Sequence, residues 1–371
     1  MTVSDARWSA ATATGYSFAL GMASVALPLQ AVAAGYDAAE VGLLVAASAV
    51  SQMISRLFLG KVMRRVPDWL IIAAACALLA LSCLVVAAAS APVPFLVAQV
   101  LQGMSRACFW TGSQTHVVRG EGSSVKALAS INLVGNLGLL AGPVAAGVLI
   151  GDDARLALGV AAAAAAVALV PACRLHRLPP FQKLADRQPG HLWQRPGVWD
   201  GCRAGITAGG WRALLGSYVP LALVEAGQSP MSVGLLIAAA NAASILGAWI
   251  VRHVVDGRAV RRTIDLGTPA TGLAIAATGA CASSWLLVGL ALVVSGIAAG
   301  ALQTLGPAIA ADAVHAQERG EAIAATGTFR AASLFLTPAA AAGLVALMPL
   351  AATIAVTGLL LAIPLGRRAR G

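Results

Sequence analysis

Apolar runs of about 20 residues follow one another along almost the whole chain, and short polar segments separate them. A run of that length is what an α-helix needs to cross the hydrocarbon core of a bilayer. Hydrophobic residues make up 59% of the chain and charged residues only 11%, against about 25% charged residues in an average soluble domain. A soluble protein could not bury so much apolar surface. The sequence therefore predicts an all-α integral membrane protein.

Twelve of these runs are predicted to be transmembrane helices. Their approximate boundaries are 10–33, 40–62, 69–90, 94–117, 125–150, 155–174, 200–225, 231–254, 263–282, 285–314, 322–345 and 348–366. The one long polar gap contains prolines, charges of both signs and two tryptophans, which is typical of a linker. We therefore expect a six-helix bundle over 1–174, a linker over 175–199 and a second six-helix bundle over 200–371.

The basic residues are distributed unevenly among the polar gaps. Those outside the expected helices fall in alternate loops, at both termini and in the linker, and the other loops contain only Arg155. By the positive-inside rule, both termini and the linker are predicted to be cytoplasmic. The net charge of +10 is then a feature of membrane topology, and no nucleic acid partner is expected. The alanine-, glycine- and arginine-rich composition suggests a bacterial protein, and thus the bacterial inner membrane.

An internal repeat relates the two halves. LPLQAVAAGYDAAEVGLLVAAS begins at Leu27, and VPLALVEAGQSPMSVGLLIAAA begins at Val219. More than half of the aligned positions from Pro28 to Ala47 are identical, and Pro143 pairs with Pro338 in a second alignment. Two pseudo-symmetric bundles in parallel orientation are therefore predicted, an arrangement that is common among transporters.

Two short motifs lie in this framework. The stretch after the second expected helix reads RLFLGKVMRRVPD, and the fifth expected helix contains GLLAGPVAAG. They resemble the loop motif G-x-x-x-D-R-x-G-R-R and the antiporter signature G-x-x-x-G-P-x-x-G-G of the major facilitator superfamily. In the loop, Gly60 and Arg65 match, whereas Arg64 stands at the acidic position and Pro67 at the second glycine. The equivalent loop of the second half, RHVVDGRAVRR, has an acid at Asp256.

The antiporter signature matches more completely, with Ala146 in place of one late glycine. The resemblance implies the fold of this superfamily and an exporter that exchanges its substrate for protons. Independently of it, Gly135, Gly138 and Gly142 form a smooth stripe on one helix face, which allows close packing in lipid. Pro143 favours a bend, although static packing is the alternative. The predicted gating residues are Gly60, Arg65, Asp256, Gly138, Gly142, Pro143, Gly147 and Pro338.

Arginines lie near the middle of two expected helices, Arg106 in the fourth and Arg212 in the seventh. No carboxylate falls at the same depth, and a charge at the bilayer centre needs a polar surrounding. The resemblance places both helices at a central cavity, where the two side chains could bind a carboxylate or phosphate. The alternative is an arginine satisfied by helix carbonyls and by Asn or Gln. The other predicted substrate-binding residues are Gln102, Trp110, Tyr16, Tyr218 and Gln303.

Proton coupling needs a titratable group in the pathway, and Asp312 is the predicted one. The five histidines lie at helix ends or in the linker and are expected to be solvated. We find no HxxxxD, HExxH or nucleotide-binding motif, and the six cysteines are scattered. The sequence therefore predicts no enzyme, no catalytic residues, no metal and no cofactor.

The predicted function is secondary active transport by alternating access. The chain is expected to export a small organic molecule, which could be an anion, in exchange for protons. An importer or exchanger of an organic or inorganic anion on the same fold is the alternative, because only the signature in the fifth helix favours export. The expected partners are the substrate and the lipid bilayer, and the chain is expected to be a monomer.

Overall fold

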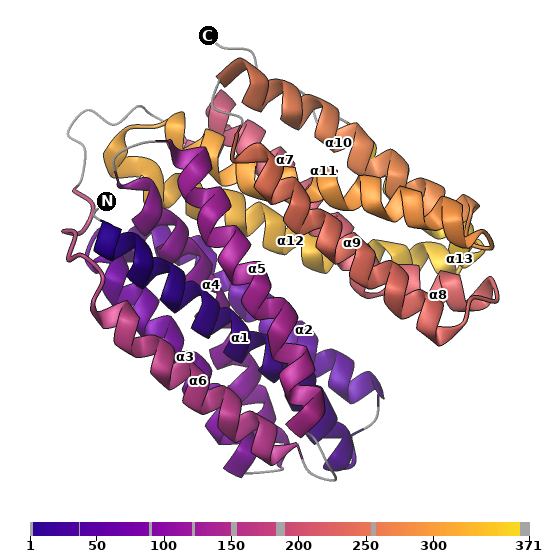
Figure 1. Cartoon of the computed structure of the whole chain (residues 1–371), viewed down its shortest axis with the longest axis horizontal. Helices are drawn as coiled ribbons and strands as arrows, with labels where there is room; N and C mark the ends of the chain where they lie inside the picture. The colour runs from indigo at the N-terminus through magenta and orange to yellow at the C-terminus, as the bar shows by residue number, and fades with distance from the viewer. Residues whose placement is uncertain are drawn as a thin grey trace. The chain divides into compact units, whose positions relative to one another are not determined.

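The computed structural model describes residues 3–36, 38–88, 91–120, 123–149, 154–182, 190–253 and 257–363. Within these ranges the chain forms thirteen α-helices and two short 3-10 helices, and no strand (Figure 1). The predicted all-α fold class is confirmed. Asp256, one of the predicted gating residues, lies outside the described ranges.

Residue contacts divide the chain into two compact units, which we describe separately. Unit 1 consists of Met1–Gly122, Ser130–Arg187 and Ala316–Ala324, and unit 2 of Ser123–Ala129, Gln188–His315 and Ala325–Gly371. Each unit thus includes the first residues of one helix whose remainder belongs to the other. The domain boundaries inferred from the sequence stay a prediction.

The first six helices follow the predicted apolar runs. They are α1 (Val3–Ala33), α2 (Ala38–Val62), α3 (Asp68–Ala88), α4 (Pro92–Val118), α5 (Ser124–Leu149) and α6 (Arg155–Cys173). The largest difference is at α1, which begins at Val3 and not near position 10. Asp5, in its first turn, is bound by His116 and by the backbone N–H of His176. These contacts stabilise a polar first turn of α1, which lies before the apolar run and is therefore not predicted from hydropathy.

The helices that follow the linker are α7 (Pro196–Gly216), α8 (Tyr218–Glu225), α9 (Pro230–Val251), α10 (Gly257–Ala280), α11 (Trp285–Asp312), α12 (Arg319–Val345) and α13 (Leu350–Ala362). The single helix expected over 200–225 is divided at Ser217 into α7 and α8. Pro220 gives the physical reason, because it cannot donate to the carbonyl of Gly216 and its ring crowds that carbonyl.

Equivalent helix pairs pack in the two units. In unit 1, α4 packs on α2 and α3, and α3 also packs on α6. In unit 2, α11 packs on α9 and α10, and α10 also packs on α13. The internal repeat of the sequence makes α9, α10, α11 and α13 the counterparts of α2, α3, α4 and α6. The two halves therefore build their cores from corresponding contacts.

Large apolar side chains are exposed on both units, among them Phe58, Val148, Val167 and Leu290. A bilayer would cover such side chains. By length and hydropathy, seven of the described helices can cross a membrane: α1, α3, α5, α6, α9, α11 and α12. The long helices α2, α4, α7 and α10, which are not among these seven, carry charged or amide side chains.

Candidate functional site

The GLLAGPVAAG stretch lies on α5 and packs closely against α1 in unit 1. A Cβ atom added to Gly138 would lie 2.6 Å from the carbonyl oxygen of Thr14, and one added to Gly142 would overlap that of Phe18. Only glycine allows the two backbones to approach this closely. Gly147 differs, because an added Cβ would meet nothing within 4 Å. The glycine stripe is therefore a helix contact face that excludes Gly147.

The two prolines predicted to bend helices both lie inside continuous helices, Pro143 in α5 and Pro338 in α12. The ring of Pro143 contacts α1, where a Cβ added to Gly21 would lie 2.9 Å from its Cδ. The carbonyl of Pro338 accepts a hydrogen bond of 3.3 Å from the hydroxyl of Tyr218. This hydrogen bond joins Tyr218, a predicted substrate-binding residue, to α12.

In unit 2 the corresponding contact, between α7 and α12, has its glycines on the other helix. A Cβ added to Gly205 would lie 2.9 Å from the carbonyl oxygen of Thr326, and one added to Gly209 would lie 2.5 Å from that of Arg330. On α12, Ser333 donates a hydrogen bond of 2.7 Å to the backbone of α7. Both units therefore have a close glycine-mediated contact, although the GLLAGPVAAG motif marks it only in unit 1.

Arg106 lies on α4 and is bound by Gln102, one helical turn earlier. Its guanidinium donates to Gln102 Oε1 at 2.7 Å, and Gln102 is only 3% exposed. Among the described residues no carboxylate forms an ion pair with Arg106. The structure therefore brings together these two predicted site residues.

Tyr16, another predicted substrate-binding residue, is fully buried against α4. Its hydroxyl lies 2.8 Å from Ser105 Oγ, which itself donates to the carbonyl of Ala75. Its ring stacks on Phe109 with a centroid distance of 3.7 Å, and Trp110 meets Phe109 edge-on. In this conformation Tyr16 joins α1 to α4 and offers no surface to a ligand.

Arg56 on α2 was not among the predicted site residues, and it is 6% exposed. Its Nε has no hydrogen-bond partner in the described part of the chain. In unit 2 the comparably buried Arg203 instead forms ion pairs with Asp200 at 2.5 Å and Asp265 at 3.9 Å. The sequence places Arg56 inside an apolar run, but it does not reveal that no carboxylate among the described residues pairs with this side chain.

The other predicted residues of unit 2 also involve amide oxygens. Arg212 is exposed and donates to Asn241 Oδ1, and the Asn241 amide donates to the carbonyl of Ile237 at 2.9 Å. Gln303 accepts from Arg330 at 3.0 Å. Amide partners are thus present at Arg106, Arg212 and Arg330.

The loop motif after α2 contains an ion pair of inverted sign. Arg64, at the position where the superfamily motif has an acid, pairs with Glu321 at 2.6 Å. Gly60 makes room for it, because an added Cβ would lie 3.2 Å from the Cα of Glu321. Arg65, the residue predicted from the motif, is exposed. Glu321 belongs to the first turns of α12, which pack with unit 1.

Reversing one charge of this pair is expected to impair transport, and reversing both is expected to restore it. Both side chains are about one third exposed, so the pair contributes at most about 1 kcal/mol. We therefore expect Arg64→Glu and Glu321→Arg each to lower the initial transport rate up to about fivefold, and the double variant to recover. Failure of the double variant to recover would contradict a functional pairing.

Asp312, predicted to couple protons, is the last residue of α11 and is exposed. Its Oδ1 accepts a hydrogen bond of 2.6 Å from Ser124 Oγ, in the first turn of α5, within unit 2. This is a contact at a helix end. The geometry therefore does not favour a buried proton pathway through Asp312.

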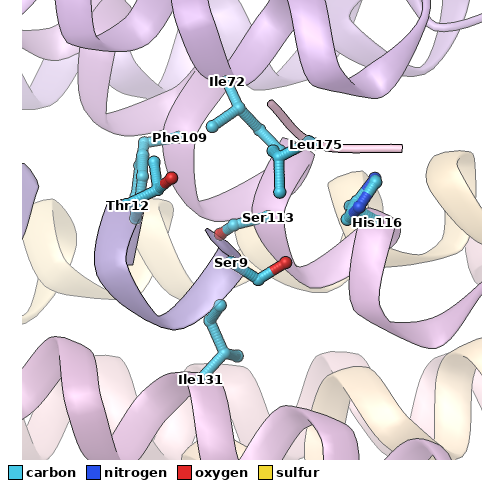
Figure 2. Close-up of a pocket in the computed structure, with 8 residues that line it drawn as sticks. All are labelled: Ser9, Thr12, Ile72, Phe109, Ser113, His116, Ile131 and Leu175. Carbon is cyan, nitrogen blue, oxygen red and sulfur yellow. The ribbon is translucent and has the colours of Figure 1, made fainter. Parts of the chain in front are cut away.

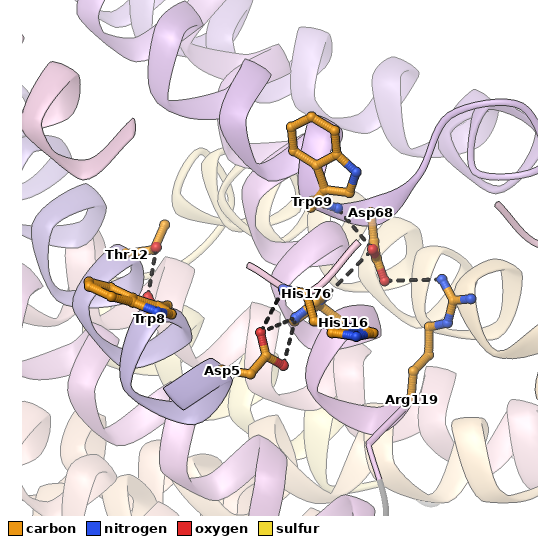
Figure 3. Close-up of polar contacts among 8 residues, drawn as sticks. All are labelled: Asp5, Trp8, Thr12, Asp68, Trp69, His116, Arg119 and His176. Atoms are coloured by element: carbon orange, nitrogen blue, oxygen red, sulfur yellow. Dashed lines mark hydrogen bonds and ion pairs between the residues drawn. The ribbon is translucent and has the colours of Figure 1, made fainter. Parts of the chain in front are cut away.

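His116 on α4 is 1% exposed, which contradicts the expectation that the histidines are solvated. Its Nε2 lies 3.2 Å from Asp5 Oδ2 and its Nδ1 lies 3.4 Å from Asp68 Oδ1 (Figure 3). Arg119 also binds Asp68, at 3.2 Å. Nε2 is within hydrogen-bond distance of Asp5, whereas Nδ1 lies within ion-pair distance of Asp68 and has no hydrogen bond among the described residues. Because carboxylates lie on both sides of the ring, the arrangement fits a protonated His116. With Arg119 included, the cluster is then electrically neutral.

A small pocket of unit 1 borders this cluster, and His116 forms one of its walls (Figure 2). Hydroxyls of Ser9, Thr12 and Ser113 line it together with apolar side chains. The hydroxyls of Ser9 and Ser113 are buried and have no partner among the described residues. The pocket is too narrow to admit a water molecule in this conformation, so it is no substrate site.

The sequence model of the Major Facilitator Superfamily matches residues 10–338, so the chain belongs to this superfamily. The human organic anion transporter MFSD10 (TETRAN) has a similar structure, with a TM-score of 0.79 and 16% identity over 97% of this chain and 98% of that one. The transporter FucP of E. coli, in the outward conformation, has a TM-score of 0.79 and 13% identity over 96% of both chains. The proton:xylose symporter XylE has a TM-score of 0.75 and 12% identity, over 98% of this chain and 95% of that one.

A comparison with curated proteins finds no match. Likeness at such low identity establishes the fold, and membership of the superfamily establishes the class of protein. The chain is therefore a multi-pass membrane transporter for a small-molecule substrate, and it is not an enzyme.

Proposed function

We propose that the chain is a secondary active transporter that exports a small organic molecule in exchange for protons by alternating access. The observation that supports export is the GLLAGPVAAG segment, which carries the antiporter signature on α5. Its glycines Gly138 and Gly142 lie against the backbone of α1, so the signature occupies a close helix contact. A contact of this kind suits helices that slide or rock against each other.

A second candidate is an importer or exchanger of an organic or inorganic anion. It is favoured by Arg106 and Arg212, which have amide partners and no carboxylate among the described residues. One structural neighbour is an organic anion transporter. Neighbours described as proton symporters support proton coupling but not the direction of export.

The proposed orientation has both termini and the linker in the cytoplasm of a bacterium, and a monomer in the inner membrane. The distribution of basic residues supports this topology. Of the two candidate proton-binding groups, His116 is buried and Asp312 is exposed. We therefore regard His116 as the stronger candidate for a proton-binding group.

Transport by proteoliposomes with imposed pH gradients tests both candidates. An antiporter is expected to accumulate substrate inside vesicles whose lumen is acidic, because outward proton flow then drives uptake. Collapse of the gradient by a protonophore should abolish this accumulation. A panel of anionic and cationic organic compounds identifies the substrate class. Saturable uptake that ignores the pH gradient would contradict proton exchange and favour the anion exchanger.

A further inference from the structure

Of the buried N–H donors in unit 1 that have no acceptor among the described residues, three lie on α2 and on the middle of α4. They are the Nε of Arg56, the Nε2 of Gln102 and the Nε of Arg106. Buried polar groups are nearly always hydrogen-bonded, so each exception needs an explanation. The orientation of the Gln102 amide follows from its bond to Arg106, since Oε1 accepts from that guanidinium. The unsatisfied group of each residue is therefore a donor.

The three donors belong to one region, where α2 packs against α4. A Cβ added to Gly103 would lie 2.7 Å from Ser51 Cβ, and Ser51 Oγ donates to the carbonyl of Val100. A Cβ added to Gly103 would also lie 2.9 Å from the backbone nitrogen of Gln52. Arg56 on α2 and Arg106 on α4 each lie about one helical turn C-terminal to this contact.

The positive charge of this region is not balanced by a carboxylate within the described part of the chain. Neither arginine has a carboxylate partner in the described part of the chain, although Arg203 in unit 2 has two. A buried guanidinium without a counter-charge is unfavourable. A bound anion would supply both the missing acceptors and the missing charge.

We propose that Arg56, Gln102 and Arg106 form a binding site for a small anion within unit 1. The ligand class is a carboxylate or phosphate group, free or as part of an organic molecule, because its oxygens match planar guanidinium donors. The proposal rests on the proposed function only in treating this anion as the transported substrate. It differs from the sequence-based expectation of an Arg106–Arg212 pair, because Arg56 takes the place of Arg212.

Equilibrium binding to the purified full-length protein in lipid nanodiscs tests the site. The probes are inorganic phosphate, benzoate and, as a cation of similar size, benzylammonium. We expect the wild type to bind at least one anion and not the cation. Arg56→Gln is expected to weaken anion binding at least tenfold, and Arg56→Lys to retain part of it. Arg252→Gln, which alters an exposed arginine at the end of α9, is the matched control and should bind as the wild type.

Thermal unfolding of the same samples separates binding from a structural role. Without ligand, Arg56→Gln should unfold at an equal or higher temperature than the wild type, because it removes an unbalanced buried charge. A lower unfolding temperature would show that Arg56 has a structural partner and would overturn the proposal. The proposal would also be overturned if Arg56→Gln bound the anions as well as the wild type does, or if the wild type bound no anion at millimolar concentrations. A third contrary result would be that Arg212→Gln loses anion binding while Arg56→Gln keeps it. Binding needs no gradient, so a failure of proton-driven export would leave this result interpretable.

Discussion

Replacement of Gly142 by alanine is expected to lower the free energy of unfolding by about 1–3 kcal/mol, the usual range for overpacking. The added Cβ would overlap the carbonyl oxygen of Phe18 and lie 2.7 Å from the backbone nitrogen of Met22. Because these are backbone atoms of α1, no side chain can rotate out of the way and the two helices must separate. Transport is expected to fall about tenfold, the factor that corresponds to about 1.4 kcal/mol.

Gly147→Ala is the matched control on the same helix. Its Cβ would meet nothing within 4 Å, and alanine favours a helix over glycine by up to about 1 kcal/mol. Its stability should therefore be unchanged or slightly raised. Gly209→Ala on α7 should resemble Gly142→Ala, although no motif marks this glycine. Denaturant unfolding in micelles measures all three, and equal stability of the Gly142 and Gly147 variants would contradict the contact face.

The positions of most helices could be predicted because hydropathy is a local property. The run expected at 285–314 is α11, Trp285–Asp312, and the run expected at 69–90 is α3, Asp68–Ala88. In lipid each helix must satisfy its own backbone, so an apolar run defines a helix before any tertiary contact forms. Fold class therefore followed from sequence with few assumptions.

The division of the seventh expected helix could not be predicted in this way. Pro28 and Pro220 occupy equivalent positions in the internal repeat, yet α1 continues through Pro28 while the helix ends just before Tyr218 in the second half. The effect of a proline on a membrane helix depends on neighbouring helices, which can satisfy the freed backbone groups. Which helices are neighbours depends on the tertiary fold and cannot be inferred from the sequence around the proline.

The predicted site was affected by the same limitation. The sequence identified Arg106 and Gln102, which the structure places in contact, because a charge inside an apolar run is conspicuous. It did not identify the burial of Tyr16 or the partners of His116. These depend on contacts between residues about 90 and 110 positions apart in the chain. The position of a residue within an apolar run indicates its depth in the bilayer. It does not indicate which neighbouring helix the side chain faces.

The cluster around His116 leads to the second large expected effect. Replacement of His116 by leucine removes a buried positive charge and leaves the carboxylates of Asp5 and Asp68 balanced by Arg119 alone. Loss of one partner of a buried ion pair destabilises a protein by about 3–5 kcal/mol. We therefore expect the free energy of unfolding of His116→Leu to fall by about that amount, measured by denaturant unfolding in micelles.

The double variant His116→Leu/Asp5→Asn separates charge balance from loss of packing. It restores a neutral cluster, since one carboxylate then faces one guanidinium, and it should recover a large part of the lost stability. His253→Leu, which alters an exposed histidine at the end of α9, should remain close to the wild type. If the double variant is as unstable as His116→Leu, the imidazole acts through its shape and not its charge. If it recovers stability yet no longer transports against a pH gradient, His116 is the group whose protonation transport requires.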